Sequence, residues 1–331
     1  MSDDKSTASQ VERWISVGAT IVAPVTVIGA LLFYFGYVSS RSQYAYFGVD
    51  VDTIGLSTQD YIMRSPQPLL VPLLVLTLGG AGLLWLDAAV ARRVASAAAG
   101  ATSKAHATTS GSDPAEAAVR MARRSAIAGL AMLTVGVLLL LSYPYVRDWA
   151  LYALATPLLF ALGAALIAYA SRIRNLLERG RREHARVTDK DAGSVRKAAA
   201  PADVSMLSRR VPGVLIYVVI AASIFWATAT IAQWSGLGLA QYDAQRLRFL
   251  PSVILDTKER LFLRDPGIEE TALPASDGQT FRYRYRHLRL LIEGHDRMFL
   301  VPDSWSASDS TLIVPLDGSV RVQFQFQNQP P

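Results

Sequence analysis

Apolar and polar residues occur in long separate blocks along this chain, and the apolar blocks are its strongest structural signal. A helix needs roughly 20 apolar residues to cross the ~30 Å hydrocarbon core of a bilayer. Five blocks meet this requirement, at residues 15–38, 69–90, 125–146, 149–170 and 211–233. Because lipid offers no hydrogen-bond partner to an exposed backbone amide, each block is expected to form a transmembrane helix.

A different pattern begins near residue 240, where short runs of apolar and polar residues replace the long apolar blocks. Runs at 248–263, 281–302 and 311–326 have the composition of β-strands separated by turns. They predict a compact antiparallel β domain of five or six strands over residues 240–327. The fold class is therefore a helical membrane protein with five transmembrane helices and a small C-terminal antiparallel β-sheet domain.

The last of these runs is expected to form a hairpin. Asp317-Gly318 is a strong two-residue turn signal, and the residues on both sides of it are typical of strands. Pro315 has no backbone donor, so it is expected at a sheet edge or in a bulge. In the second strand four apolar residues alternate with polar ones and are expected to face the core, namely Val320, Val322, Phe324 and Phe326.

The alternation changes phase inside the run at 281–292. Tyr283 and Tyr285 share one face, but continuing with a period of two places Leu288 on the opposite, arginine-bearing face. Two interpretations remain open near His287: a β-bulge, or a strand that passes from a sheet edge into a core with two buried faces.

Lys and Arg are concentrated in two connections, at 91–124 and 171–210. The first holds six Lys or Arg against two Asp or Glu, and the second holds eleven against five. Because cytoplasmic loops carry the excess of Lys and Arg, both connections are expected to be cytoplasmic. Residues 1–14 are then cytoplasmic as well, whereas the connection at 39–68 and the β domain at 240–327 are extracytoplasmic.

The net charge of the chain is +6, and the excess positive charge lies in the two basic connections next to the membrane. It indicates attraction to anionic lipid rather than a nucleic-acid partner. The sequence has no Cys, which excludes disulfides and thiolate chemistry, and it shows neither a phosphate-binding loop nor a nucleophile motif. We therefore expect no catalytic residue, no cofactor and no metal site; a pair of metal ligands at His287 and His295 is the alternative.

Within the spans, the sequence gives few polar positions. Asp87 is the one ionisable candidate and is expected to form an interfacial ion pair with Arg92 or Arg93. Spans three and four are separated by so few residues that they must form a tight antiparallel hairpin. Small residues suit close helix packing in spans two and four; they are Gly79, Gly80, Gly82, Ala161, Gly163, Ala164, Ala165 and Ala168. The connection at 91–124 is expected to be partly disordered.

The extracytoplasmic connection at 39–68 contains a helix-start signal, because Ser57 and Asp60 have the spacing of a capping box. A short helix over about 58–63 is predicted to follow. Tyr44, Tyr46 and Phe47 are expected at the membrane–water interface. The stretch is interpreted as an element that docks on the outer leaflet or on the β domain, with a ligand-binding surface as the alternative.

Two stretches, YFGVDVDTIGLSTQDYIMRS and YRYRHLRLLIEGHDRMFLVPDSW, carry a resemblance. The sequence resembles uncharacterised multi-pass, five-span plasma-membrane proteins of high-GC Gram-positive bacteria. The resemblance implies the membrane architecture and a plasma-membrane location, and it supplies no catalytic residue.

The arginine row of the β domain is the most suggestive feature outside the membrane. Arg282, Arg284 and Arg286 lie on one face of the predicted strand and are candidate ligand-binding residues, since guanidinium groups match phosphate geometry. The alternative is a solvated face paired with carboxylates.

These observations lead to a hypothesis of a non-enzymatic envelope protein. Its expected partners are membrane lipid and an envelope protein or an anionic wall polymer, and a homo-oligomer stays open. A transporter or channel subunit is the second hypothesis, and a transmembrane sensor that signals to 171–210 is the third.

Overall fold

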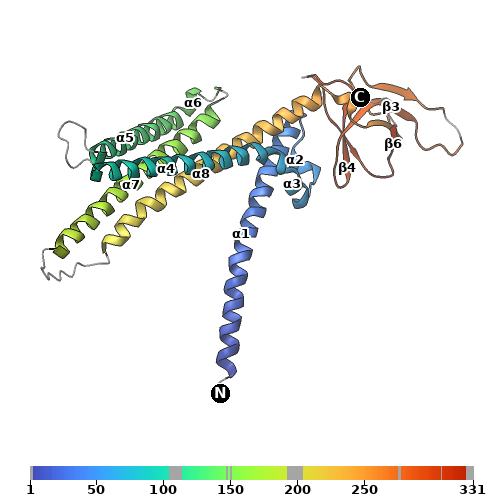
Figure 1. Cartoon of the computed structure of the whole chain (residues 1–331). Helices are drawn as coiled ribbons and strands as arrows, with labels where there is room; N and C mark the ends of the chain where they lie inside the picture. Colours follow the sequence, from blue (N-terminus) through green and yellow to red (C-terminus); the bar gives the residue numbers. More distant parts are fainter. Residues whose placement is uncertain are drawn as a thin grey trace. The chain divides into compact units, whose positions relative to one another are not determined.

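The computed structural model of the chain describes residues 3–103, 114–146, 148–149, 151–191, 204–274, 277–306 and 308–325. The helices within these ranges are α1 (Asp3–Tyr46), α2 (Val51–Ile54), α3 (Thr58–Arg64), α4 (Pro66–Ser103), α5 (Pro114–Leu141), α6 (Tyr143–Val146), α7 (Tyr152–Asp191), α8 (Val204–Ala244) and the 3₁₀-helix η1 (Leu247–Phe249). The strands are β1 (Ser252–Thr257), β2 (Glu269–Ala272), β3 (Tyr283–Glu293), β4 (Arg297–Pro302), β5 (Leu312–Pro315) and β6 (Val320–Gln325) (Figure 1).

Five of these helices are long and apolar enough to cross a membrane, as the sequence predicts. The apolar windows are Val22–Tyr46 in α1, Pro66–Trp85 in α4, Val119–Leu141 in α5, Tyr152–Asn175 in α7 and Gly213–Ala244 in α8. The fold class is thus confirmed: five candidate membrane helices precede a six-stranded antiparallel sheet.

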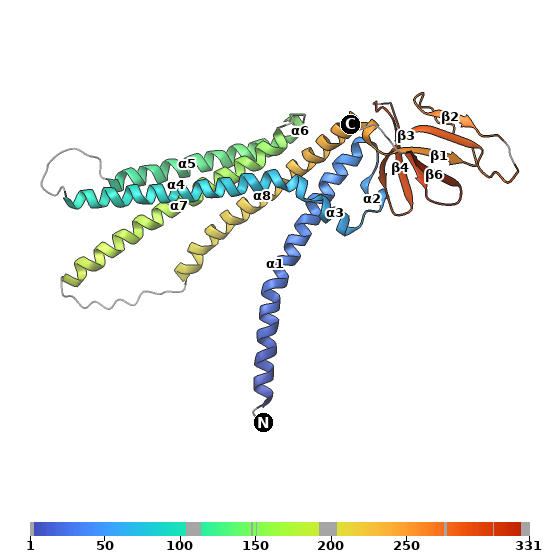
Figure 2. The same ribbon diagram turned by 45° about the vertical axis from the view of Figure 1, so that its right-hand side comes forward.

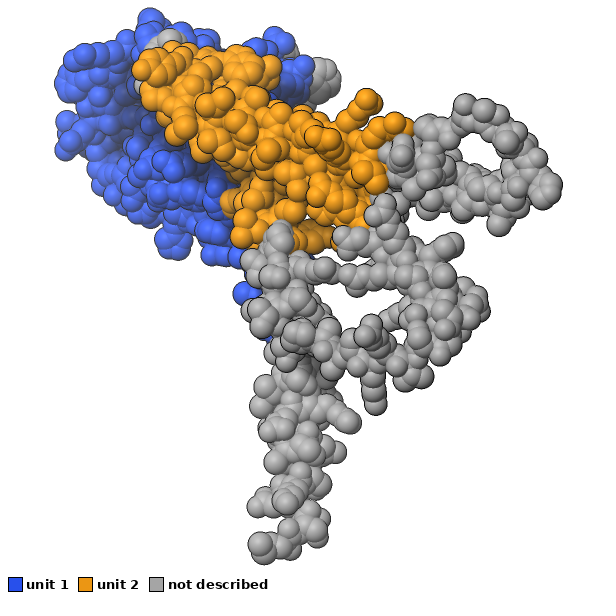
Figure 3. All heavy atoms as spheres, turned by 90° about the vertical axis from the view of Figure 1, so that its left-hand side faces the viewer, with its two compact units in different colours: residues 1–72, 231–331 blue, residues 73–230 orange. Residues whose placement is uncertain are grey.

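The chain forms two compact units, each described by itself. One contains residues 1–72 and 231–331, and the other contains residues 73–230 (Figure 3). The first unit therefore holds the β domain together with α1, α2, α3 and the end of α8. The second holds most of α4, all of α5 and α7, and the beginning of α8.

In the second unit, α5 and α7 form the tight antiparallel hairpin that the short connection predicts (Figures 1 and 2). The helix backbones approach each other closely at two glycines, because a Cβ on Gly163 would lie 2.9 Å from the carbonyl oxygen of Gly129. Ala122 and Ala164 are buried. The packing expected of Gly163 and Ala164 is confirmed.

Two other expectations for the spans have different outcomes. A Cβ at Gly79, Gly80 or Gly82 would meet no atom within 4 Å, so these glycines make no close contact within the described chain, and packing between chains stays a prediction. The ion pair expected of Asp87 lies outside the described side chains, and residues 104–113 of the connection predicted to be partly disordered lie outside the described residues.

The sheet has the strand order β5-β4-β3-β1-β6, and β2 pairs with the start of β3 (Figure 2). β3 and β4 form the hairpin expected from the sequence. The expected hairpin of β5 and β6 is wrong: β5 pairs with β4, and β6 pairs with β1. Pro315 does lie in an edge strand, where its missing donor costs no ladder hydrogen bond.

The connection between β5 and β6 requires the sheet to roll up. A flat sheet would place these two edge strands about 19 Å apart, at four strand spacings of about 4.8 Å. The five residue steps from Pro315 to Val320 reach at most about 18 Å. Val314 of β5 and Val320 and Val322 of β6 accordingly pack in the same core. Phe324 was expected in that core but is 56% exposed, and Phe326 lies outside the described residues.

A β-bulge explains the change of phase in β3. Tyr285 pairs with Leu255 and Leu288 with Val253, so β3 has one more residue than β1 between these two pairs. His287, at this bulge, has a positive φ of 63°. The bulge returns Leu288 to the face of Tyr285, and both side chains are fully buried. Of the two interpretations left open by the sequence, the bulge is confirmed.

Candidate functional site

Strand β4 is buried on both faces, and this determines what the β domain contacts. Met298 and Leu300 point into the internal core of the rolled sheet. Phe299 and Val301 point the other way, into two clusters formed with α1, α2, α3 and the end of α8. We call these two clusters together the junction. Alternate side chains of β4 thus pack in the β core and against the helical residues outside the sheet.

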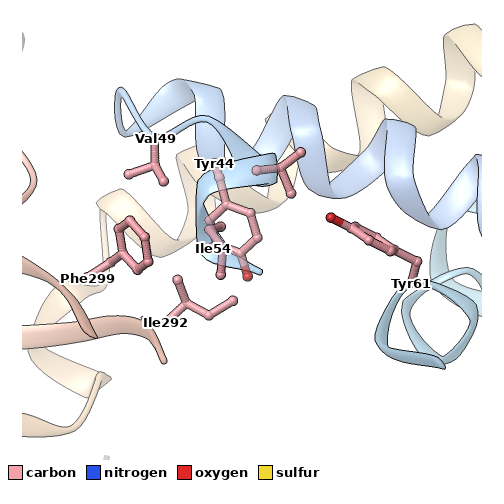
Figure 4. Close-up of a cluster of buried hydrophobic side chains, with 7 residues drawn as sticks. Tyr44, Val49, Ile54, Tyr61, Ile292 and Phe299 are labelled. Carbon is pink, nitrogen blue, oxygen red and sulfur yellow. The ribbon is translucent and has the colours of Figure 1, made fainter. Parts of the chain in front are cut away.

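The first cluster of the junction surrounds Phe299 and Ile292 of the sheet (Figure 4). Its other buried members come from the end of α1 and from the residues between α1 and α4, and they are Tyr44, Val49, Val51, Ile54 and Tyr61. Arg64 donates a hydrogen bond to the phenol oxygen of Tyr44 over 2.7 Å. The connection at 39–68 therefore packs against the β domain, which favours the docking interpretation over a ligand-binding surface.

The second cluster surrounds Phe47, which packs with Val301, Leu247 and Ala240. Trp305 meets the Phe47 ring edge-on, with 5.0 Å between ring centroids. Protein covers Phe47 and Tyr44, so their rings do not face lipid, and their position at the membrane–water interface stays a prediction. Tyr46 alone of the three aromatic residues stays exposed.

Local structure in the connection follows from its capping residues. Ser57 caps α3 by accepting a hydrogen bond from the Asp60 amide, and the Asp60 carboxylate accepts one from the Ser57 amide, which completes the predicted capping box. The hydrogen bonds from Ser57 lower the pKa of Asp60. Gly55 ends α2 in the left-handed conformation with a φ of 76°, directly beside His295 of the β3–β4 turn.

Three glycines permit the closest backbone approaches of the junction. A Cβ on Gly36 of α1 would lie 1.9 Å from the carbonyl oxygen of Tyr61. A Cβ on Gly236 of α8 would lie 2.0 Å from that of Ser39. A Cβ on Gly294, in the β3–β4 turn, would lie 2.2 Å from the carbonyl oxygen of Ile54. The sequence analysis missed all three, because a glycine in an apolar span or in a turn carries no sign of its neighbour.

The outward face of β1, β3 and β6 carries the arginines singled out in the sequence. We call this surface, with Arg282, Arg284, Arg286 and Arg321, the arginine face. At its centre the Asp256 side chain is fully buried. The register of the sheet places Arg284 on one side of Asp256 and Arg321 on the other.

Asp256 binds both neighbouring arginines. Arg284 donates from Nε and Nη2 to the two carboxylate oxygens, over 2.8 and 3.0 Å. Arg321 donates from Nε and Nη2 to Oδ2. These hydrogen bonds, with that from Arg284 the strongest, lower the pKa of the Asp256 carboxyl. The pairing holds two guanidinium groups in fixed positions while their side chains stay 24% and 45% exposed.

The other two predicted residues differ from Arg284 in their exposure and in their ion pairing. Arg282 and Arg286 are exposed, and neither forms an ion pair among the described residues. Glu269 of β2 lies opposite Arg286 in the ladder. The arginine face thus has four guanidinium groups against the carboxylates of Asp256 and Glu269.

Asp256 and Arg321 were not among the predicted site residues. A single carboxylate inside the apolar run VILDT is a signal for a buried charge that needs a cationic partner. The partner itself follows only from strand register.

A second charged cluster lies beside the bulge. Asp303 accepts a hydrogen bond from Arg289 and lies 3.0 Å from Nδ1 of His287. Arg289 also donates to the carbonyl oxygens of Arg248 and Leu250, so it ties β3 to the segment after α8. In the part of the chain that the structure describes, no group of three or more His, Cys, Asp or Glu side chains is arranged to hold a metal ion.

Comparison of the chain with protein-family models, with curated proteins and with solved structures finds no match. The five apolar helices support a multi-pass membrane protein. The resemblance to proteins of high-GC Gram-positive bacteria stays a prediction.

Proposed function

We propose that this protein is a non-enzymatic plasma-membrane protein that displays its β domain on the extracytoplasmic side and binds an anionic ligand or partner there. The observation that carries the proposal is the arginine face, where buried Asp256 fixes Arg284 and Arg321 beside the exposed Arg282 and Arg286. Guanidinium groups that are already ordered lose little entropy when they bind a carboxylate or phosphate.

The orientation rests on charge and on the junction. The basic connections at 91–124 and 171–210 favour the cytoplasm. The connection at 39–68 and the β domain share the buried clusters of the junction, which supports their placement on the same side of the membrane. With five spans, that side is opposite the basic connections. The junction would hold the β domain close to the outer surface, within reach of wall polymers and envelope proteins.

Binding of two polyanions to the full-length protein in detergent tests the proposal. Polyphosphate and poly-L-glutamate represent phosphate and carboxylate ligands. Because a charge-assisted hydrogen bond contributes about 1.5–3 kcal/mol, R282A/R286A is expected to weaken binding of the preferred polymer by about 10-fold or more. The salt dependence of its dissociation constant should also decrease.

A single-charge control is R264A, which removes one exposed guanidinium from the loop before β2. It is expected to bind within about two-fold of the wild type, since exposed charges away from the site contribute little. Equal binding by the wild type and R282A/R286A, or equal losses in R282A/R286A and R264A, would refute the arginine face as a ligand site.

A further inference from the structure

An open surface cavity of about 480 Å³ lies along the beginning of α5. Its lining comes from one side of α5 and consists of Arg120, Met121, Arg124, Ser125 and Ala128. The sequence-predicted span begins at residue 125, directly after Arg124, so both arginines precede the expected membrane boundary. Arg120 and Arg124 are one helical turn apart and exposed, so both lie on the same face of α5.

The lining changes character along the helix. Two cationic groups lie at its beginning, and among the side chains that the structure describes no carboxylate lines it. Ser125 donates its hydroxyl to the helix carbonyl oxygens of Met121 and Ala122, so the arginines are the donors left for a ligand. Met121 is 51% exposed, and the apolar surface continues along α5 with Ile127 and Leu130.

The neighbouring side of α5 packs against α7. Ala122 and Gly129 are buried, and Gly129 forms the close contact with Gly163 of α7. The arginines therefore project beside the hairpin contact rather than into it. A ligand of the cavity needs an anionic head for the arginines and an apolar part for the helix surface that follows.

We propose that this cavity binds the phosphate headgroup of an anionic phospholipid, with an acyl chain lying along α5 beyond Ala128. Arg120 and Arg124 donate to the phosphate oxygens, for which guanidinium is the best matched side chain. Basic pockets between membrane helices on the cytoplasmic side are suited to anionic headgroups. The site belongs to residues 73–230 and does not depend on the arginine face.

Lipid retention by the full-length protein tests the proposal. The protein is exchanged into mixed micelles that contain equal amounts of phosphatidylglycerol and phosphatidylcholine, and retained lipids are counted by native mass spectrometry. The wild type is expected to retain phosphatidylglycerol in preference to phosphatidylcholine. R120Q/R124Q should reduce that retention by about 10-fold, because two charge-assisted contacts are lost.

The matched control is R92Q/R123Q. It removes the same charge from the same basic connection, but neither Arg92 nor Arg123 lines the cavity. It is expected to retain phosphatidylglycerol within about two-fold of the wild type. Thermal unfolding of both variants shows that the helices remain folded, and R120K/R124K should restore part of the retention because it keeps the charge but loses the planar fork.

Three results would overturn the site: equal retention of both lipids by the wild type, equal losses in R120Q/R124Q and R92Q/R123Q, or full displacement of the lipid by inorganic phosphate. The last result would show that the arginines bind free phosphate and that the acyl chain adds nothing. The polyanion experiment on the β domain is independent of all three.

Discussion

At the residue scale, the burial of Asp256 determines which arginines of the β domain are available. A carboxylate with no exposed surface needs charged or hydrogen-bonding partners, and strand register supplies Arg284 and Arg321. Arg284 is therefore both a candidate ligand-binding residue and a partner of a buried charge. Arg282 and Arg286 have no such second role among the described residues.

Substitution of Asp256 by Asn is expected to destabilise β1 and its neighbours. The change removes the charge that both arginines contact, and hydrogen bonds to charged groups contribute about 1.5–3 kcal/mol. Hydrogen–deuterium exchange of the β1 amides in the full-length protein at pH 7 measures the effect. D296N, which removes an exposed Asp–Arg pair, should leave β1 exchange unchanged.

The destabilisation of β1 in D256N is expected to depend on pH. The arginines lower the pKa of folded Asp256, so its stabilisation is complete above the unfolded pKa of about 3.9 and is lost as the pH falls from there toward the folded value. The difference in β1 exchange between the wild type and D256N should therefore shrink below about pH 4. A difference that grew on acidification would show that the carboxylate is not stabilised in its charged form.

At the element scale, contacts between helices, turns and strands depend on single small residues. α1 passes α8 where Ser39 meets Gly236, and α1 passes α3 where Gly36 meets Tyr61. These approaches bring backbone against backbone, so no rotamer change of a larger side chain could relieve a clash. The β3–β4 turn meets α2 through Gly294 in the same way.

Substitution of Gly236 by Ala is expected to separate α1 from α8 and loosen the junction. Ala has the higher helix propensity by about 1 kcal/mol, which favours the variant locally, but the added Cβ would lie 2.0 Å from the Ser39 carbonyl oxygen. Overpacking of this kind typically costs about 1–3 kcal/mol. The measurement is the thermal unfolding midpoint in detergent, together with protease cleavage between the membrane helices and the β domain.

Gly213 provides the matched control, because it lies in the same helix and a Cβ there would meet no atom within 4 Å. G213A is expected to be neutral or slightly stabilising. If G236A and G213A behaved alike, the close contact between α8 and α1 would have no energetic role.

At the scale of the whole molecule, the proposed orientation depends on the two basic connections. The sequence contains no Cys, so single-cysteine variants can be labelled without background. S306C lies in the β domain and S110C in the 91–124 connection. An impermeant maleimide is expected to label S306C in intact cells and S110C only after the membrane is opened.

The opposite labelling pattern would place the β domain in the cytoplasm. The wall-facing role would then fail, while the anionic-lipid site on α5 would move to the outer leaflet with its arginines. A protein labelled at both positions in intact cells would contradict the five-span arrangement itself.

The sequence by itself determined the elements that have a local period or a local signal. Apolar blocks predicted five membrane helices, alternation predicted the β domain, and Ser57 with Asp60 predicted the cap of α3. The change of phase near His287 marked an irregularity, and the strand register identified it as a bulge. In these cases the periodicity or the capping signal lies within one stretch of sequence, so it is visible without knowledge of the residues that the element contacts.

Only the tertiary structure decided which distant residues meet. The turn signal at 317–318 was read as a hairpin, but the rolled sheet pairs β5 and β6 with other strands. Tyr44 and Phe47 are covered by the β domain, and Asp256 binds arginines 28 and 65 residues away. Such contacts depend on strand register and helix crossings, which are set by packing of the whole chain and leave no periodic trace in the sequence.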